Sequence, residues 1–196
     1  MGGLWDGGVV RDGPPRLALV PFTADGARLI EGWFDHPEVR LRLGGREWIH
    51  REVRLIAERP GQEFRGLTTL RSHGWLATDP AGTAVAFIGG DVYDRWATYQ
   101  GEHAGRAVLS DVDPRRSMGL AYVVDPARWG EGIGRATLTT VLGHPDVADV
   151  EAFYCGIEAG NVASRRCALA AGFTVLDPEP DWEGTLYFRR GRPSDL

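Results

Sequence analysis

The chain has 196 residues, of which 43% are hydrophobic and 25% are charged, and this composition fits one globular domain with a sizeable core. Its formal net charge of -5 argues against a general nucleic-acid binder, and no apolar run approaches the ~20 residues that a membrane-spanning helix needs. The chain contains no lysine, which excludes a nucleotide-triphosphate P-loop and Schiff-base catalysis through lysine.

Histidines and cysteines give little sign of special chemistry. The 5 histidines and 2 cysteines show no metal-ligand spacing, so no metal site is expected. The first residues lack the basic and apolar regions of a signal peptide. We therefore expect a cytoplasmic protein in which Cys155 and Cys167 are reduced thiols.

The expected elements follow one another in a mixed order. Residues 1–15, rich in Gly, Asp and Pro, are expected to form a mobile arm, and residues 16–192 a single domain. Strands are expected over residues 17–22, 74–78, 84–91, 118–124, 147–157, 173–176 and 186–189. Helices are expected from an N-cap at Thr23 to a stop at His36-Pro37, and over residues 47–58, 135–142 and 161–171. This order indicates an α+β protein with a mixed sheet.

One connection is unusually long. Residues 93–116 are polar and separate two expected strands. Connections of this length are uncommon in compact domains unless they are functional. The segment is therefore expected to be either a functional loop or a longer β-ribbon.

The most informative stretch is a glycine-rich turn between an expected strand and an expected helix. Gly130, Gly132 and Gly134 remove side chains from every second position, so the backbone can approach a ligand and the N–H groups at the helix start stay free. These donors and the helix dipole suit a phosphate or pyrophosphate. A tight connection without a ligand is the alternative. The spacing differs from the dinucleotide fingerprint Gly-x-Gly-x-x-Gly.

A second motif opens the last expected helix, Asn161-Val162-Ala163-Ser164. Asn161 is a good N-cap residue with Ser164 three positions later, and Gly172 is expected to end the helix in a left-handed conformation. Ordinary helix capping explains each of these residues when it is considered alone.

Taken together, the two motifs resemble the GNAT superfamily of acyl-CoA-dependent N-acetyltransferases. The first motif is Val-x-Pro-x-x-Trp-Gly-x-Gly-x-Gly, and the second is Asn-x-Ala-Ser followed by Ala-Gly-Phe. The resemblance implies a mixed, mostly antiparallel sheet of about seven strands flanked by about four helices. It is clearest over residues 117–190, and over residues 17–92 it rests on element order. Trp129 replaces the Gln or Arg of many members, as is common in relatives similar to the ribosomal-protein N-terminal acetyltransferases.

The resemblance implies acetyl-CoA as co-substrate. The amides of residues 130–135 would hold its pyrophosphate, and its pantetheine arm would pair with the preceding strand like an added strand. That strand would splay from the next one and leave a slot for the thioester. The cofactor-binding residues implied in this way are Tyr122, Val123, Val124, Trp129, Gly130, Glu131, Gly132, Ile133, Gly134, Arg135, Asn161 and Ser164. Candidates for the 3′-phosphate, or simply solvated charges, are Arg128, Arg135, Arg165 and Arg166.

The reaction implied by the resemblance is direct transfer to an amine. A backbone N–H near Val124 would polarise the thioester carbonyl, and a carboxylate would take a proton from the amine. The candidate catalytic bases are Asp91, at the end of the strand expected over residues 84–91, and Asp113, which precedes the strand expected over residues 118–124, although turn capping also explains Asp113.

The chain departs from the family pattern at the residue that often protonates the leaving thiolate. A tyrosine is usual four residues after the serine of the second motif, and here that position is Ala168. Water, Tyr122 or Tyr154 are the substitutes to be considered.

The acceptor is the least determined part. A small-molecule amine, antibiotic- or amino-sugar-like, is favoured by the acidic and aromatic segments, and residues 33–39 are similar to aminoglycoside-type acetyltransferases. Residues 93–103, with Trp33 and Trp48, are expected to form its binding wall, although both tryptophans suit the core equally. A protein N-terminal acetyltransferase and a non-catalytic acyl-CoA sensor are the alternatives. Dimers are frequent in this family, so a homodimer stays open.

Overall fold

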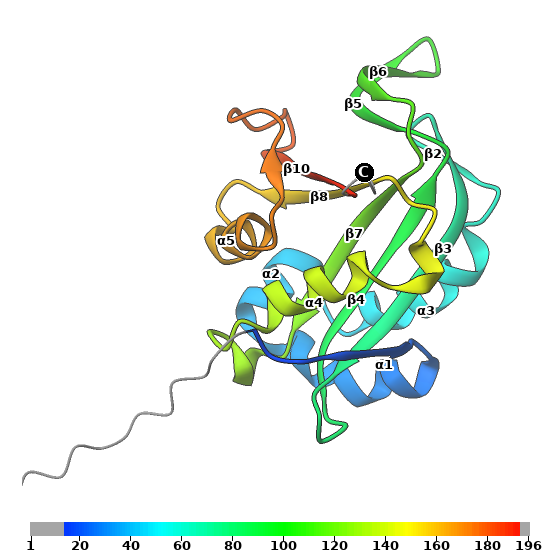
Figure 1. Ribbon diagram of the computed structural model, residues 1–196. Coiled ribbons are helices and arrows are strands. Elements are labelled where there is room, and N and C mark those ends of the chain that lie inside the picture. The colour runs from blue at the N-terminus through cyan, green and yellow to red at the C-terminus, as the bar shows by residue number, and fades with distance from the viewer. Residues whose placement is uncertain (1–13, 193–196) are drawn as a thin grey trace, which may run out of the picture.

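The computed structural model describes residues 14–192 as an α+β domain (Figure 1). Most of the arm expected over residues 1–15 lies outside the described residues. The strands are β1 (Ala18–Pro21), β2 (Glu63–Phe64), β3 (Leu67–Thr78), β4 (Ala84–Tyr93), β5 (Trp96–His103), β6 (Arg106–Asp113), β7 (Ser117–Val124), β8 (Ala152–Glu158), β9 (Thr174–Val175) and β10 (Thr185–Gly191).

The main sheet has the strand order β1-β3-β4-β7-β8-β10-β9, with the short β2 paired to β3. Every neighbouring pair is antiparallel except β7 and β8, which run parallel. The expected mixed, mostly antiparallel sheet of about seven strands is therefore confirmed. β5 and β6 form a separate ribbon that projects beyond the main sheet (Figure 1).

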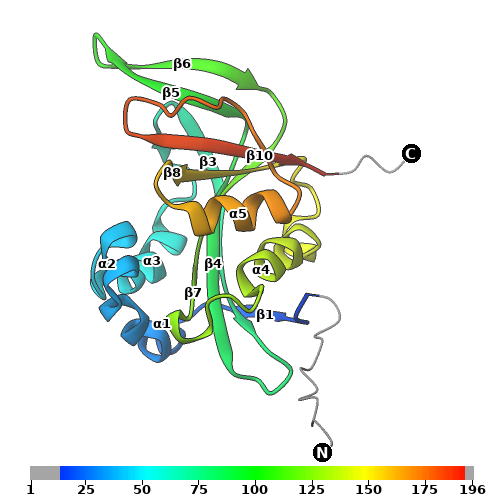
Figure 2. The same cartoon turned by 90° about the vertical axis from the view of Figure 1, so that its left-hand side faces the viewer.

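Helices cover both faces of this sheet. They are α1 (Ala24–Ile30), α2 (Pro37–Leu43), α3 (Glu47–Glu58), α4 (Ile133–Leu142) and α5 (Val162–Ala170), with 3-10 turns at Glu31–Asp35, Pro126–Arg128 and Pro145–Val147. The group α1–α3 lies on one face and α4 on the other, while α5 lies beside β8 and β10 (Figure 2). None of the helices within residues 14–192 is long and apolar enough to cross a membrane.

Three element boundaries differ clearly from expectation, and proline explains two of them. The strand expected over residues 74–78 is β3, which begins much earlier, at Leu67. The expected stop at His36-Pro37 is also the start of α2, because Pro37 occupies its first turn and the His36 ring accepts the Glu38 N–H. The strand expected from residue 147 begins at Ala152, because residues 145–147 form a 3-10 turn. Other local signals hold: α3 has the expected bounds, and Thr23 caps α1.

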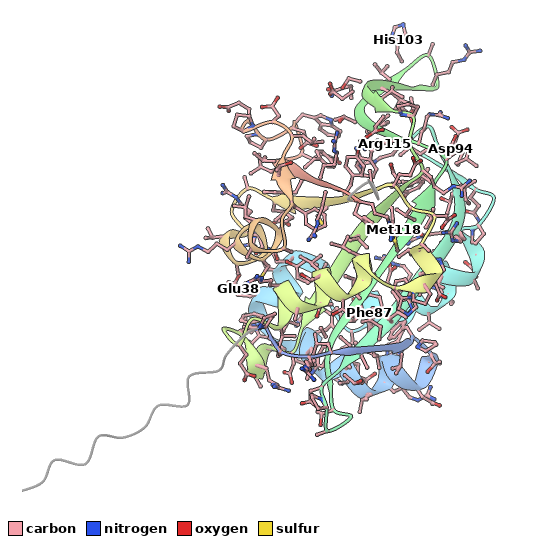
Figure 3. All side chains as sticks on the ribbon, viewed as in Figure 1. Glu38, Phe87, Asp94, His103, Arg115 and Met118 are labelled. Carbon is pink, nitrogen blue, oxygen red and sulfur yellow. The ribbon has the colours of Figure 1, made fainter. Side chains whose placement is uncertain are left out.

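The long polar segment is the β-ribbon that was one of its two expected forms. β5 and β6 pair antiparallel from Trp96↔Asp113 to His103↔Arg106. His103 lies at the tip of the ribbon (Figure 3). The ribbon therefore places its base, not its tip, against the main sheet, and Trp96 and Asp113 are both at that base.

Candidate active site

The strands β7 and β8 part halfway along β7. β7 pairs with β4 over its whole length, from Ser117↔Tyr93 to Val124↔Ala86, but with β8 only as far as Gly119↔Tyr154. The Asp125 N–H bonds to Val85 on β4, so by alternation the backbone groups of Tyr122 and Val124 face away from β4. The expected splay is confirmed, and it leaves an open strand edge beyond Gly119.

The glycine turn follows directly on this edge. Gly130 and Gly132 have φ values of +87° and +77°, a region that favours glycine. A Cβ added at Gly130 would have no heavy atom of the described residues within 4 Å. Gly132 is the N-cap of α4 and, having no side chain, makes no side-chain cap hydrogen bond. The Arg135 N–H contacts the Cys167 thiol, and the N–H groups that precede it in α4 are available to a bound group.

Gly134 has a different reason to be glycine. It lies inside α4 and is buried, and a Cβ there would come within 2.9 Å of the Cys167 Sγ. Its lack of a side chain thus permits α4 to pack against α5. The Ile133 side chain is also buried, so only backbone groups of these two residues can reach a ligand.

Trp129 closes the end of β7. Its indole N–H donates to the Val124 carbonyl at 3.0 Å, and its ring meets His36 edge-on with centroids 4.6 Å apart. The side chain is 46% exposed. Trp129 therefore holds in place the backbone that connects the open edge of β7 to the glycine turn.

Of the four candidate arginines, two are engaged elsewhere. Arg128 pairs with both Asp79 and Glu131 at 2.8 Å, and Arg165 donates to the Ala159 carbonyl. Arg135 and Arg166 are exposed and stay candidates for a phosphate.

The second motif caps α5 as expected. The Asn161 side chain accepts the Ser164 N–H at 3.1 Å. The Tyr122 hydroxyl donates to the Ser164 carbonyl at 3.4 Å, which joins the start of α5 to β7. Burial raises the pKa of Tyr122 far above its usual value, so this hydroxyl keeps its proton at neutral pH.

A pocket of about 180 Å³, here called the narrow pocket, lies where β7 and β8 part. Strands β4, β7 and β8 and helix α3 contribute to it, and its lining residues are Glu52, Arg59, Phe87, Gly89, Gly90, Asp91, Tyr93, Trp96, Gly119, Leu120, Ala121, Tyr154 and Gly156. The rings of Trp96 and Tyr154 stack with centroids 4.1 Å apart at the side of this pocket.

Asp91 is therefore in the narrow pocket, where it is firmly held. The Arg59 guanidinium pairs with it at 3.1 Å, and the Ser72 hydroxyl donates to it at 2.7 Å. Glu52 shares Arg59 at the longer distance of 3.4 Å. Burial raises the pKa of Glu52, and the negative charge of Asp91 adds to that effect while Arg59 opposes it. Nothing in the helical pattern of residues 47–58 singled out Glu52, because only the fold turns that position toward the sheet.

Asp113 lies in a different environment, at the base of the β5–β6 ribbon. Arg115 donates to both of its carboxylate oxygens, and the Tyr154 hydroxyl donates to it at 2.7 Å. The hydrogen bonds from Arg115 hold the pKa of Asp113 well below its usual range. Burial and the bond to Asp113 raise the pKa of Tyr154. Arg115 and Asp94 both lie near the base of the ribbon (Figure 3).

A second pocket of about 640 Å³, here called the wide pocket, adjoins the first through the Trp96–Tyr154 stack, whose two residues line both. One wall is the β5–β6 ribbon and the other is the segment 176–185 before β10. Five carboxylates line it, against two guanidinium groups: Asp111, Asp113, Asp177, Glu179 and Asp181, with Arg115 and Arg189. The wide pocket is therefore acidic.

Some of the residues expected to form an acceptor wall line the wide pocket, and others do not. From residues 93–103, Trp96, Thr98 and Gln100 line the wide pocket. Trp33 and Trp48 instead pack against the core cluster under α1 and α3, where Trp48 stacks on Phe34. The core alternative is thus the right one for these two tryptophans.

Arg65 joins the two walls of the wide pocket from outside. It pairs with Glu183 of the segment 176–185 through two contacts of 2.9 Å, and its guanidinium lies 4.8 Å from the ring centroid of Tyr99 on β5. Its φ of +49° is uncommon for a residue with a side chain. Nothing in the sequence pairs these three distant positions.

Comparison with known proteins gives one family. A family model described as an acetyltransferase (GNAT) domain matches residues 16–174. An uncharacterized N-acetyltransferase of Bacillus subtilis (strain 168), YfmK, is 36% identical over 161 residues, which span 81% of this chain and 86% of that protein. A mycothiol acetyltransferase of Nocardiopsis dassonvillei is 29% identical over 137 residues, which span 67% of this chain and only 40% of that protein.

Solved structures agree at the level of fold. The aminoglycoside acetyltransferase AAC(6')-Ib in complex with coenzyme A and kanamycin superposes with a TM-score of 0.62 at 14% identity, over 90% of this chain and 95% of that one. The likeness to this solved structure is one of overall fold, whereas the family model and the Bacillus subtilis relative match in sequence. The chain belongs to the GNAT acetyltransferase family and is an N-acetyltransferase.

Proposed function

We propose that this acetyltransferase uses acetyl-CoA to acetylate a primary amine of a small, cationic molecule of the antibiotic or amino-sugar type. The observation that supports this most is the acidic wide pocket, which opens onto the narrow pocket at the splay of β7 and β8. An amine that enters through the wide pocket would meet the open edge of β7 at the Trp96–Tyr154 stack.

The residues beside β7 fit acetyl-CoA. Gly130 and Gly132 leave a cradle without side chains at the uncapped start of α4, which suits a pyrophosphate. The backbone groups of Tyr122 and the N–H of Val124, which face away from β4, would pair with the pantetheine arm, as an added strand pairs with a sheet edge. From Val124 to Leu120 the strand spans about 13 Å, at ~3.3 Å per residue, and this stretch leads from the turn to the narrow pocket. Acetyl-CoA supplies the activated acetyl group.

In this proposal the open edge of β7 binds acetyl-CoA and also takes part in the reaction. A backbone N–H of Tyr122 or Val124 would donate to the thioester carbonyl oxygen, which gains negative charge as the amine attacks. Asn161 and Ser164 would face the pantetheine from the start of α5. Tyr122 on β7 and Tyr154 on β8, both protonated at neutral pH, are the hydroxyls that we propose to protonate the leaving thiolate, since Ala168 cannot.

The two proposed bases differ in how well they suit that role. Asp91 lines the narrow pocket, beside the expected position of the amine. Asp113 lines only the wide pocket and is bound by Arg115 and Tyr154, so its low pKa makes it a poor proton acceptor. We propose that Asp113 acts by positioning the Tyr154 hydroxyl.

The test is to measure thiol release from acetyl-CoA with a panel of acceptors. Polyamines, amino sugars and aminoglycosides represent the first class, and peptides with free N-termini and no lysine represent protein acceptors. Turnover with the small cationic amines is expected. Turnover confined to peptides would favour protein N-terminal acetylation, and coenzyme A binding without turnover on any acceptor would indicate a sensor.

A further inference from the structure

Glu52 is the second carboxylate of the narrow pocket. It comes from helix α3, whereas Asp91 comes from strand β4. The Glu52 side chain is only 13% exposed. The pocket that it lines also contains Gly119 and Tyr154, the last paired positions of β7 and β8. A buried carboxylate thus lies at the place where the proposed amine and thioester would meet.

The two carboxylates of this pocket share one guanidinium unequally. Asp91 receives Arg59 at 3.1 Å, the Ser72 hydroxyl at 2.7 Å and the Tyr93 hydroxyl at 3.4 Å. Among residues 14–192, Glu52 receives hydrogen bonds only from Arg59, at 3.4 and 3.5 Å. Asp91 is therefore the partner that neutralises Arg59, and Glu52 is left with lone pairs free for another donor.

The lining of the narrow pocket holds two carboxylates, Glu52 and Asp91, against one guanidinium, Arg59, and this excess favours a cation beside Glu52. Arg51 lies on the same helix, α3, and Arg59 directly follows that helix. Asp91 and Tyr93 face Glu52 from β4, and Tyr154 from β8. Burial and Asp91 make its carboxylate costly to keep charged, whereas the arginines act in the opposite direction. A protonated amine would relieve this cost, first by pairing with the carboxylate and then by giving it a proton.

We propose that Glu52 is the general base of the reaction, a role that rests on the proposed acetyl transfer to an amine. The acceptor ammonium gives one proton to the Glu52 carboxylate and becomes a neutral amine. Its nitrogen forms a bond to the thioester carbonyl carbon as the carbon–sulfur bond breaks. The nitrogen then loses a second proton, the thiolate takes one up, and Glu52 returns its proton to water. Asp91 and Arg59 position Glu52 and do not exchange protons with the substrate.

The experiment compares the variants Glu52→Gln, Glu52→Asp and Glu58→Gln. Glu58 lies at the end of the same helix but is exposed, so it is the matched control. Glu52→Gln should lower kcat/KM for the amine by about 10²-fold or more and abolish the rise in activity on the acidic side of the pH profile. Glu52→Asp should restore part of the rate together with that rise. Acetyl-CoA affinity, measured by calorimetry, should be unchanged in all three.

The outcomes separate this role from the proposed function. If the wild-type protein acetylates amines and the Glu52→Gln variant keeps the same rate and pH profile, the proposed role of Glu52 is overturned. The acetylation of amines is then still supported. Absence of turnover in the wild-type protein with every amine would instead refute the proposed function. A Glu52→Asp variant as inactive as Glu52→Gln, though folded, would show that Glu52 supports the pocket only structurally.

Discussion

The two sides of the site are built in opposite ways. The side proposed for acetyl-CoA is almost continuous in sequence, from the free edge of β7 through the glycine turn into α4. The side proposed for the acceptor is assembled from the β5–β6 ribbon, the segment 176–185 and α3. Backbone geometry makes the first, whereas side-chain ion pairs make the second. Substitutions should therefore act on one side without the other.

On the acetyl-CoA side, the largest effect is expected in the glycine turn. Gly132→Asp should weaken acetyl-CoA binding by roughly tenfold to a hundredfold more than Gly132→Asn, because only the aspartate repels a pyrophosphate. Both residues tolerate a positive φ, so the strain at +77° is nearly matched. Calorimetry with acetyl-CoA measures the difference. Equal affinities for the two folded variants would refute the phosphate-binding role of the turn.

Asp113 should affect stability more than chemistry. Its low pKa means that its ion pair stabilises the fold above the usual carboxylate pKa, near pH 4, and that this contribution is lost as pH falls further. Asp113→Asn should therefore lower the free energy of unfolding at pH 7, by about 1–3 kcal/mol, and by clearly less near pH 2. Denaturant titrations at the two pH values test this. An equal loss at both would contradict the ion-pair origin.

A smaller and more selective effect is expected from the Arg65 contact between the two walls. Arg65→Lys keeps the charge but not the paired contacts with Glu183, and Glu183→Gln removes the partner charge. Either change should raise KM for the acceptor by roughly three- to tenfold, since each loosens one wall by about 1 kcal/mol. KM for acetyl-CoA should not change. A rise in both KM values would mean that Arg65 stabilises the whole domain.

The smallest effect is expected at Trp129. Trp129→Phe removes the indole donor to the Val124 carbonyl and keeps a ring beside His36. Loss of this one exposed hydrogen bond, about 1 kcal/mol, should raise KM for acetyl-CoA by two- to fivefold. Steady-state kinetics with acetyl-CoA as the varied substrate provide the value. An increase in the KM for the acceptor alone would contradict the assignment of Trp129 to the acetyl-CoA side of the site.

The same contrast explains what could be predicted from the sequence. The fold and the helix caps at Thr23 and Asn161 follow from short-range patterns, and the structure confirms them. The position of α2 did not follow, because Pro37 can end one helix and begin another. Glu52 and Arg65 have no local signal that marks them. The partner of Arg65, Glu183, lies 118 residues away, and the strand residues that share the narrow pocket with Glu52 begin only at Phe87.

The most direct test of the proposed acceptor site uses charge. Asp177 and Glu179 are exposed residues of the wide pocket, so the double variant Asp177→Asn, Glu179→Gln should fold normally. The measurement is the ratio of kcat/KM for a diamine to that for a monoamine of similar length, with Glu58→Gln, Glu63→Gln as the control. We expect the wild-type protein and the control to favour the diamine about tenfold or more, and the double variant to lose most of that preference. A preference that survives in the double variant would contradict entry of the acceptor through the wide pocket.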